Sequence, residues 1–148
     1  MCHAALWTDT GGSIRQPASL CDVVGFKPTY GRVSRHGIIA YASSFDQVGP
    51  ITTSVEDTAL IMEVIAGKDG WDSTASSREV PRYSELLESA GTRKIGYLTD
   101  CLEATGIDTE IKEGLMGQIK SLKDAGHQVE PVEFPYLDYL VPAYYVLT

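Results

Sequence analysis

The chain has 148 residues, of which 43% are hydrophobic and 22% charged, a composition typical of globular proteins. Its formal net charge of −8 disfavours direct binding to a nucleic-acid backbone, which requires clustered lysine and arginine. No apolar run is long enough to span a membrane, and no cysteine spacing is typical of a metal site, so we expect neither. The cysteines (Cys2, Cys21, Cys101) are predicted to be free thiols in a reducing cytoplasm, with Cys21 buried and inert.

The first residues predict a strand that runs into a tight glycine turn. Residues 1–7 are mostly apolar and lead directly into the stretch 8–17. Gly11 and Gly12 lack a Cβ, so this stretch can adopt positive φ and let another group approach its backbone. A run of backbone N–H groups in such a loop forms a concave anion site. Ser13 is therefore a candidate nucleophile for acyl transfer, with the N–H groups stabilising the oxyanion.

Opposite charges flank this glycine loop. Asp9 and Arg15 are expected to pair beneath it and to fix its shape. Pro17 suits the first turn of a short helix over residues 18–21, because its missing N–H would be unpaired there. Two alternatives stay open for the loop. One is an ordinary turn that binds nothing, and the other, which is weaker, is a phosphate-binding loop that lacks the usual lysine after Ser13.

The next elements are shorter. Residues 22–27 are rich in β-forming side chains and end at Pro28, which predicts a strand that closes into a turn. The glycine-punctuated segments that follow, as far as Tyr41, are expected to be loops. We assign no chemistry to Ser43 or Ser44, which lie in a polar turn.

A helix is predicted over residues 53–67. Ser54 or Thr53 caps its start, its apolar residues follow helical spacing, and Gly67 ends it. Residues 68–92 are polar and broken, which indicates a long surface connection with one short helix.

In that connection Trp71 is expected to pin the chain to the core. Residues 94–98 then predict a strand, 108–125 an amphipathic helix and 127–134 a second strand. Strand, helix and strand with short turns predict a parallel βαβ unit. His127 follows the helix end and is interpreted as a dipole partner rather than a catalytic base. A further helix begins near residue 137.

Three stretches carry a resemblance to a known family. Residues 8–17 (TDTGGSIRQP) resemble the nucleophile segment of the amidase signature family. Residues 23–35 and 42–50 are similar to the A subunit of the glutamyl-tRNA(Gln) or aspartyl-tRNA(Asn) amidotransferase. The match is dense over residues 2–77 and looser beyond. It implies an α/β fold in which helices flank a mixed β-sheet.

The resemblance also implies a partial amidase domain that is truncated at both ends. Residues 1–67 would form the nucleophile segment and the following helix. Residues 68–93 would form the surface connection, and 94–148 the βαβ portion with the start of a further helix. Both ends are expected to expose apolar surface that promotes aggregation.

The family's chemistry uses a lysine base, a relay serine beside a cis peptide bond and a second serine as nucleophile. Ser13 matches the nucleophile, and Thr10, Gly11 and Gly12 match the loop whose N–H groups form the oxyanion hole. Tyr144 lies in a region that corresponds to the family's substrate pocket, so it is a candidate for contacting glutamine. A packed aromatic residue is the alternative for Tyr144.

The sequence departs from the family pattern in two ways. The lysine and the relay serine belong upstream of this segment, and Lys27 matches a different family position, so the chain alone is expected to be inactive. Trp7 and Asp22 stand where the family has glycine. A large indole next to the loop raises the question of how well Ser13 is placed.

The resemblance implies a glutaminase that works through an acyl-serine intermediate. The ammonia would pass to a partner subunit, which uses ATP and Mg²⁺ to amidate a tRNA-bound glutamate or aspartate. The expected partners are glutamine and the B and C subunits of a heterotrimer, with tRNA held by the partner subunit, and no cofactor in this chain. Two alternatives remain: another amidase signature hydrolase of small amides, and a non-catalytic remnant that binds partners.

Overall fold

The structure is a computed structural model that describes residues 2–88 and 91–148. Met1 and two residues of the expected connection, 89 and 90, lie outside the described residues. The chain divides into two compact units. The first comprises the described residues up to 88 together with Tyr144–Thr148, and the second comprises residues 91–143.

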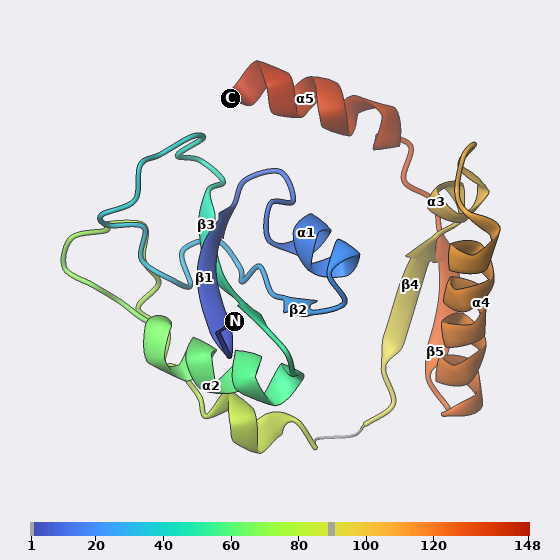
Figure 1. Ribbon diagram of the computed structural model, residues 1–148, viewed down its shortest axis with the longest axis horizontal. Coiled ribbons are helices and arrows are strands. Elements are labelled where there is room, and N and C mark those ends of the chain that lie inside the picture. The colour runs from blue at the N-terminus through green and yellow to red at the C-terminus, as the bar shows by residue number, and fades with distance from the viewer. Residues whose placement is uncertain (1, 89–90) are drawn as a thin grey trace. The chain divides into compact units, whose positions relative to one another are not determined.

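The first unit is built on a three-stranded antiparallel sheet in the order β1-β3-β2 (Figure 1). Its strands are β1 (Ala4–Asp9), β2 (Val24–Gly25) and β3 (Gln47–Thr52). The expected first strand is confirmed, whereas the second is much shorter than predicted. The central strand β3 was not predicted, because Gly49 and Pro50 are unusual inside a sheet.

Two helices and a short turn of helix accompany this sheet. Helix α1 (Arg15–Leu20) lies next to β2, and α2 (Val55–Ile65) lies next to β3. Ser54 caps α2 by accepting the Asp57 N–H at 3.0 Å, and Gly67 follows its end with a φ of 122°, as the sequence predicted. The 3₁₀ helix η1 (Tyr83–Leu86) confirms the short helix in the connection.

The second unit is a parallel βαβ arrangement. Strand β4 (Lys94–Leu98) pairs in parallel with β5 (Gln128–Val132), and α4 (Thr109–Asp124) connects them after a short helix α3 (Thr99–Glu103) that was not predicted. Asp108 caps α4 by accepting the Glu110 N–H at 2.8 Å. The predicted parallel unit is confirmed.

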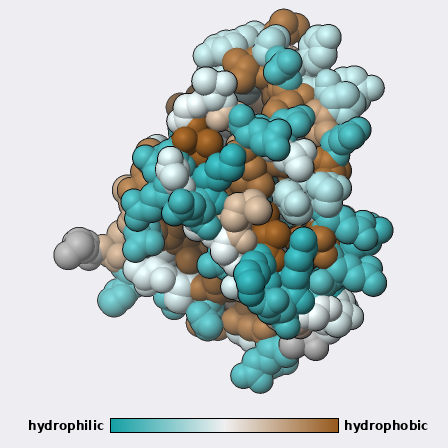
Figure 2. Space-filling view, turned by 90° about the vertical axis from the view of Figure 1, so that its right-hand side faces the viewer, coloured by the Kyte–Doolittle hydropathy of each residue, from teal (hydrophilic) through white to brown (hydrophobic). Residues whose placement is uncertain are grey.

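The chain continues through the 3₁₀ helix η2 (Leu137–Tyr139) into α5 (Leu140–Leu147), where a helix was expected. No helix among the described residues has both the length and the apolar character to cross a membrane. Hydrophobic side chains gather in patches between hydrophilic ones on the face that Figure 2 shows. The α/β class with both parallel and antiparallel pairing is confirmed.

Two expectations about the burial of single side chains are wrong. Cys21 is exposed rather than buried, as are Cys2 and Cys101, and all three are free. Trp71 does not reach the core: its side chain is 80% exposed and stacks on His36 with ring centroids 5.5 Å apart. Both errors arose because local apolar patterns do not reveal which face of a segment the rest of the chain covers.

A substitution at Gly49 tests how closely the central strand β3 packs against the backbone of Phe26. A Cβ at Gly49 would lie 2.0 Å from the Phe26 carbonyl oxygen, which belongs to the backbone and cannot move aside easily. We expect Gly49→Ala to destabilise the fold by about 2–3 kcal/mol and to lower its melting temperature, as measured by circular dichroism. Gly70→Ala is the matched control, because no atom lies within 4 Å of its Cβ position. Equal melting temperatures for the two variants would contradict the packing described here.

Candidate active site

Asp9 is the centre of the glycine loop. It ends β1, and its side chain is fully buried, at 0% exposure. Its carboxylate accepts two hydrogen bonds from the Arg15 side chain, from Nε to Oδ2 and from Nη2 to Oδ1, both at 3.0 Å. It also accepts the backbone N–H groups of Gly12 at 2.8 Å and Ile14 at 3.2 Å. The expected Asp9–Arg15 pair is therefore present, and it is joined by the loop backbone.

The charge state of Asp9 follows from these contacts. Burial alone would raise the pKa of Asp9, but the hydrogen bonds from Arg15 and from the Ile14 N–H outweigh burial and hold the pKa below its ordinary value of 3.8. Asp9 is therefore ionised at neutral pH. A buried carboxylate with this many donors fixes the backbone that supplies them.

The loop itself turns over this carboxylate. Gly12 has a φ of 133°, which a residue with a side chain rarely adopts. The Gly12 N–H is already engaged by Asp9. No hydrogen bond within the described part of the chain engages the N–H groups of Thr10, Gly11 or Ser13. In this conformation those three N–H groups are the available donors of the loop.

Ser13 lies at the exposed turn between the loop and α1, and the next side chain, Ile14, is fully buried. Among the described residues, Ser13 Oγ has no hydrogen-bond partner. The Lys27 Nζ donates to the Pro28 carbonyl at 2.8 Å and not to Ser13. The structure thus presents a solvent-accessible hydroxyl above a rigidly held backbone.

Aromatic side chains flank the same loop. A Cβ at Gly11 would lie 2.8 Å from Tyr144 Cε2, so the Tyr144 ring packs directly on Gly11. Tyr41 and Phe45 lie beside that ring, at centroid distances of 6.3 Å and 6.4 Å. Only glycine leaves room for the ring at position 11, and this contact places Tyr144 next to the candidate nucleophile loop.

A second buried carboxylate, Asp46, was missed by the sequence analysis. It is 2% exposed and accepts the Thr10 hydroxyl at 2.6 Å, across 36 positions of sequence. Nothing in the local pattern of residues 42–50 signals this contact, since it depends on how β3 returns beside β1.

Trp7 and Asp22, which stand where glycine was expected from the resemblance, have different consequences for the structure. Trp7 is 59% exposed, and the hydrogen bonds of Asp9 are intact, so the indole does not displace the loop. Asp22 has a φ of 54°, the only positive value at a non-glycine position among the described residues. This left-handed conformation explains why glycine suits that position. His127 accepts the Arg93 N–H through Nδ1 at 3.0 Å and lies in the second unit.

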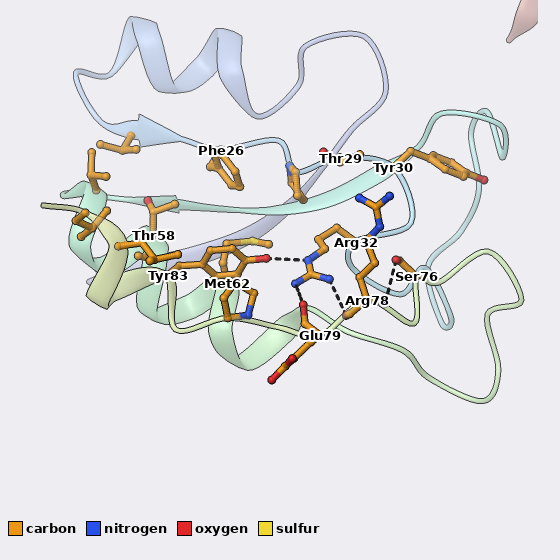
Figure 3. A pocket seen from close by; sticks show the side chains of 17 residues that line it. Phe26, Thr29, Tyr30, Arg32, Thr58, Met62, Ser76, Arg78, Glu79 and Tyr83 are labelled. Carbon is orange, nitrogen blue, oxygen red and sulfur yellow. Dashed lines mark hydrogen bonds between the residues drawn. The ribbon is translucent and has the colours of Figure 1, made fainter. Parts of the chain in front are cut away.

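A pocket in the first unit lies elsewhere, between β2, α2 and the connection that leads to η1. It has a volume of about 960 Å³ and a mainly apolar lining, which includes Phe26, Ala59 and Met62. Figure 3 shows the Arg32 guanidinium beside it, where it donates to the Tyr83 hydroxyl at 2.8 Å and to the backbone carbonyls of Arg78 and Glu79. Arg32 thus ties the connection to the segment that follows β2, within the first unit. The residues of the glycine loop do not line this pocket.

Among the described residues, no three histidine, cysteine, aspartate or glutamate side chains gather where a metal ion could bind. The exposed Ser13 hydroxyl thus lies beside backbone N–H groups that have no partner among the described residues, on a loop that a buried carboxylate supports.

Comparison with known proteins identifies the family. The amidase family profile matches residues 1–148, and the chain belongs to the amidase family. It is 51% identical over 148 residues to the A subunit of the glutamyl-tRNA(Gln) amidotransferase of Prochlorococcus marinus (strain MIT 9211). It is 50% identical over 145 residues to the corresponding protein of Rubrobacter xylanophilus. These alignments cover 99% and 97% of this chain, which spans about 30% of the length of each relative.

Solved structures of related proteins have the same fold over this chain. The A subunit of the glutamyl-tRNA(Gln) amidotransferase of Thermotoga maritima superposes with a TM-score of 0.86 at 43% identity, over 98% of this chain and 32% of that one. The peptide amidase of Stenotrophomonas maltophilia superposes with a TM-score of 0.82 at 37% identity, over 97% of this chain and 30% of that one. The fold is therefore part of the amidase signature fold.

The Asp9 carboxylate makes the free energy of unfolding depend on pH. Its folded-state pKa lies below the ordinary value of 3.8, so its stabilising contribution is complete above that value and is lost as pH falls through the folded-state pKa. We expect Asp9→Asn to lower the free energy of unfolding by about 2–3 kcal/mol at pH 7. Below pH 3.8 the difference between wild type and variant should shrink, as measured by urea unfolding at a series of pH values.

The matched control is Asp124→Asn, since Asp124 forms an exposed ion pair with Lys120. Such a pair contributes about 0–1 kcal/mol. A difference between wild type and Asp9→Asn that stays constant as the pH is lowered would contradict the role given to the ionised carboxylate.

Proposed function

We propose that the full-length protein that carries this chain is the glutamine-hydrolysing A subunit of an amidotransferase, with Ser13 as the nucleophile. One observation carries the proposal: Ser13 is displayed on a loop that buried Asp9 holds in place, beside three N–H groups without partners among the described residues. The relatives named above support this assignment. The proposed enzyme class is a carbon–nitrogen ligase that uses glutamine as the amide nitrogen donor.

The proposed reaction has two steps. Ser13 Oγ attacks the side-chain carbonyl carbon of glutamine, its proton is taken up by a base, and ammonia leaves after the nitrogen is protonated. Water then hydrolyses the glutamyl ester, which releases glutamate and restores the serine. In both steps the oxyanion would accept hydrogen bonds from the free N–H groups of Thr10, Gly11 and Ser13. Gly12 would contribute its backbone shape, since its N–H serves Asp9.

The proposal also concerns the base that takes up the proton of Ser13. Ser13 Oγ makes no hydrogen bond to a lysine or a second serine among the described residues. We propose that the lysine and relay serine of the family lie elsewhere in the longer protein, and that the 148-residue chain alone does not hydrolyse glutamine. A serine hydroxyl without a base is almost fully protonated at neutral pH and is a weak nucleophile.

The proposed partners follow from the same assignment. Ammonia would pass to a B subunit that uses ATP and Mg²⁺, in a cytoplasmic complex that also contains a C subunit. The tRNA would be held by the partner, which agrees with the net charge of −8 of this chain.

A second function has its own support. The likeness to a peptide amidase at 37% identity favours an independent hydrolase of small amides. Such an enzyme would release ammonia from amides other than glutamine and would need no partner protein. A non-catalytic remnant that binds partners would release ammonia neither from glutamine nor from other amides.

Ser13 is tested by substitution in the full-length protein. We expect Ser13→Ala to abolish glutamine hydrolysis and labelling by a fluorophosphonate, because each requires the same hydroxyl. Wild type should take up one label per molecule, and mass spectrometry should locate it on Ser13. Ser19→Ala is the matched control, since the Ser19 hydroxyl is also exposed and donates to the Gln16 carbonyl at 2.7 Å.

Labelling that persists in Ser13→Ala would refute the nucleophile. Faster release of ammonia from a small amide than from glutamine, without partner proteins, would favour the independent hydrolase. If the full-length wild-type protein shows neither labelling nor hydrolysis, the remnant is favoured.

Tyr144 is proposed to contact glutamine through its hydroxyl. Loss of one hydrogen bond of about 1 kcal/mol predicts that Tyr144→Phe raises the KM for glutamine about fivefold, with little change in kcat. Tyr145→Phe is the control, because the Tyr145 side chain is 72% exposed. An unchanged KM in Tyr144→Phe would assign Tyr144 to packing on Gly11 alone.

A further inference from the structure

Asp46 is a buried carboxylate for which the proposed chemistry of Ser13 provides no role. It directly precedes β3, and 2% of it is exposed. Its Oδ1 accepts the Thr10 hydroxyl at 2.6 Å, and its Oδ2 accepts the backbone N–H groups of Tyr41 at 2.8 Å and Ala42 at 3.0 Å. One carboxylate therefore joins the glycine loop to the turn formed by residues 41–46.

The first of these contacts acts on the proposed oxyanion donors. Thr10 stands between Asp9, which anchors the end of β1, and Gly11, which packs on Tyr144. Asp9 holds the loop through Gly12 and Ile14 but makes no hydrogen bond to Thr10 among the described residues. The hydrogen bond of the Thr10 hydroxyl to Asp46 holds this residue in place. The φ and ψ angles of Thr10 set the directions of the neighbouring N–H groups.

The other contacts act on the aromatic side chains beside the loop. Tyr41 and Phe45 both belong to the turn that Asp46 closes, and both lie beside the Tyr144 ring. The Asp46 carboxylate thus holds the loop that carries the donors and the turn that flanks the proposed glutamine contact in one arrangement.

Asp46 is charged in this arrangement. Burial would raise the pKa of Asp46, but the hydrogen bonds from Thr10, Ala42 and Tyr41 outweigh burial and lower the pKa, with a further contribution from the positive charge of Arg35. Hydrogen bonds to an ionised acceptor are stronger and more geometrically restrictive than those between neutral groups.

We propose that Asp46 is a positioning residue for amide hydrolysis, which acts through the Thr10 hydroxyl on the backbone donors beside Ser13. Asp46 does not itself touch the substrate in this account. The inference rests on the proposed function of Ser13, and it assigns a specific task to a contact between segments that are distant in sequence.

The test uses the full-length protein and compares two substitutions at Thr10. Thr10→Val has nearly the same shape but no hydroxyl, whereas Thr10→Ser keeps the hydroxyl. Both keep the backbone N–H. A misplacement of about 1 Å can slow a reaction about 100-fold, so we expect Thr10→Val to lower kcat by up to that factor with a smaller change in KM. Thr10→Ser should restore most of kcat.

Asp46→Asn provides the partner of a double-mutant cycle. It keeps the size of the side chain and removes the charge, so it should lower kcat as well. Because both changes break the same link, the double variant should be much less impaired in kcat than the product of the two single effects predicts.

Thr58→Val is the matched control for a purely structural role. The Thr58 hydroxyl forms a buried hydrogen bond with Thr52 at 2.7 Å, away from the glycine loop. We expect Thr58→Val to lower the melting temperature and to leave kcat of the folded enzyme unchanged.

Two results would overturn the inference in distinguishable ways. If Ser13→Ala abolishes hydrolysis but Thr10→Val and Asp46→Asn keep the kcat of wild type, the proposed function stands and Asp46 is only structural. If Ser13→Ala itself keeps full activity, the proposed function fails, and the role of Asp46 fails with it.

Discussion

The buried carboxylate of Asp9 is the constraint on which the rest of the site depends. A charge at 0% exposure is tolerated only when hydrogen bonds replace its lost hydration, and here Arg15 and the loop N–H groups supply them. To reach the carboxylate, the chain must turn at Gly12 with a positive φ. That turn buries Ile14 and leaves Ser13 on the outside. The position of the proposed nucleophile therefore follows from satisfying one charge.

The sheet brings the second part of the site to the first. Strand β3 pairs with β1 so that Gln47 lies opposite Asp9, and this register places the preceding residue, Asp46, beside Thr10. Gly49 is required in β3 because the Phe26 backbone passes too close for a side chain. The glycine loop and the turn at residues 41–46 are thus held by two carboxylates, one at the end of β1 and one directly before β3.

Local patterns in the sequence predicted the elements whose causes are local. An apolar run predicted the strand β1, and periodicity or capping residues predicted the helix α2 and the parallel βαβ unit; all three elements are confirmed. Strand β3 was missed because Gly49-Pro50 resembles a turn, and the Asp46–Thr10 contact because it spans 36 positions. The burial expected for Cys21 and Trp71 was wrong because covering a side chain depends on distant segments. The roles of Ser13, Thr10, Gly11, Gly12 and Tyr144 stay predictions.

The most direct test of this account is to trap the covalent intermediate. The full-length protein would be mixed with glutamine, quenched in acid within its first turnovers and digested for peptide mass spectrometry. The account predicts a glutamyl ester on the peptide that contains Ser13, removable by hydroxylamine and absent from Ser13→Ala. A glutamyl group on any other side chain, with Ser13 unmodified, would contradict it.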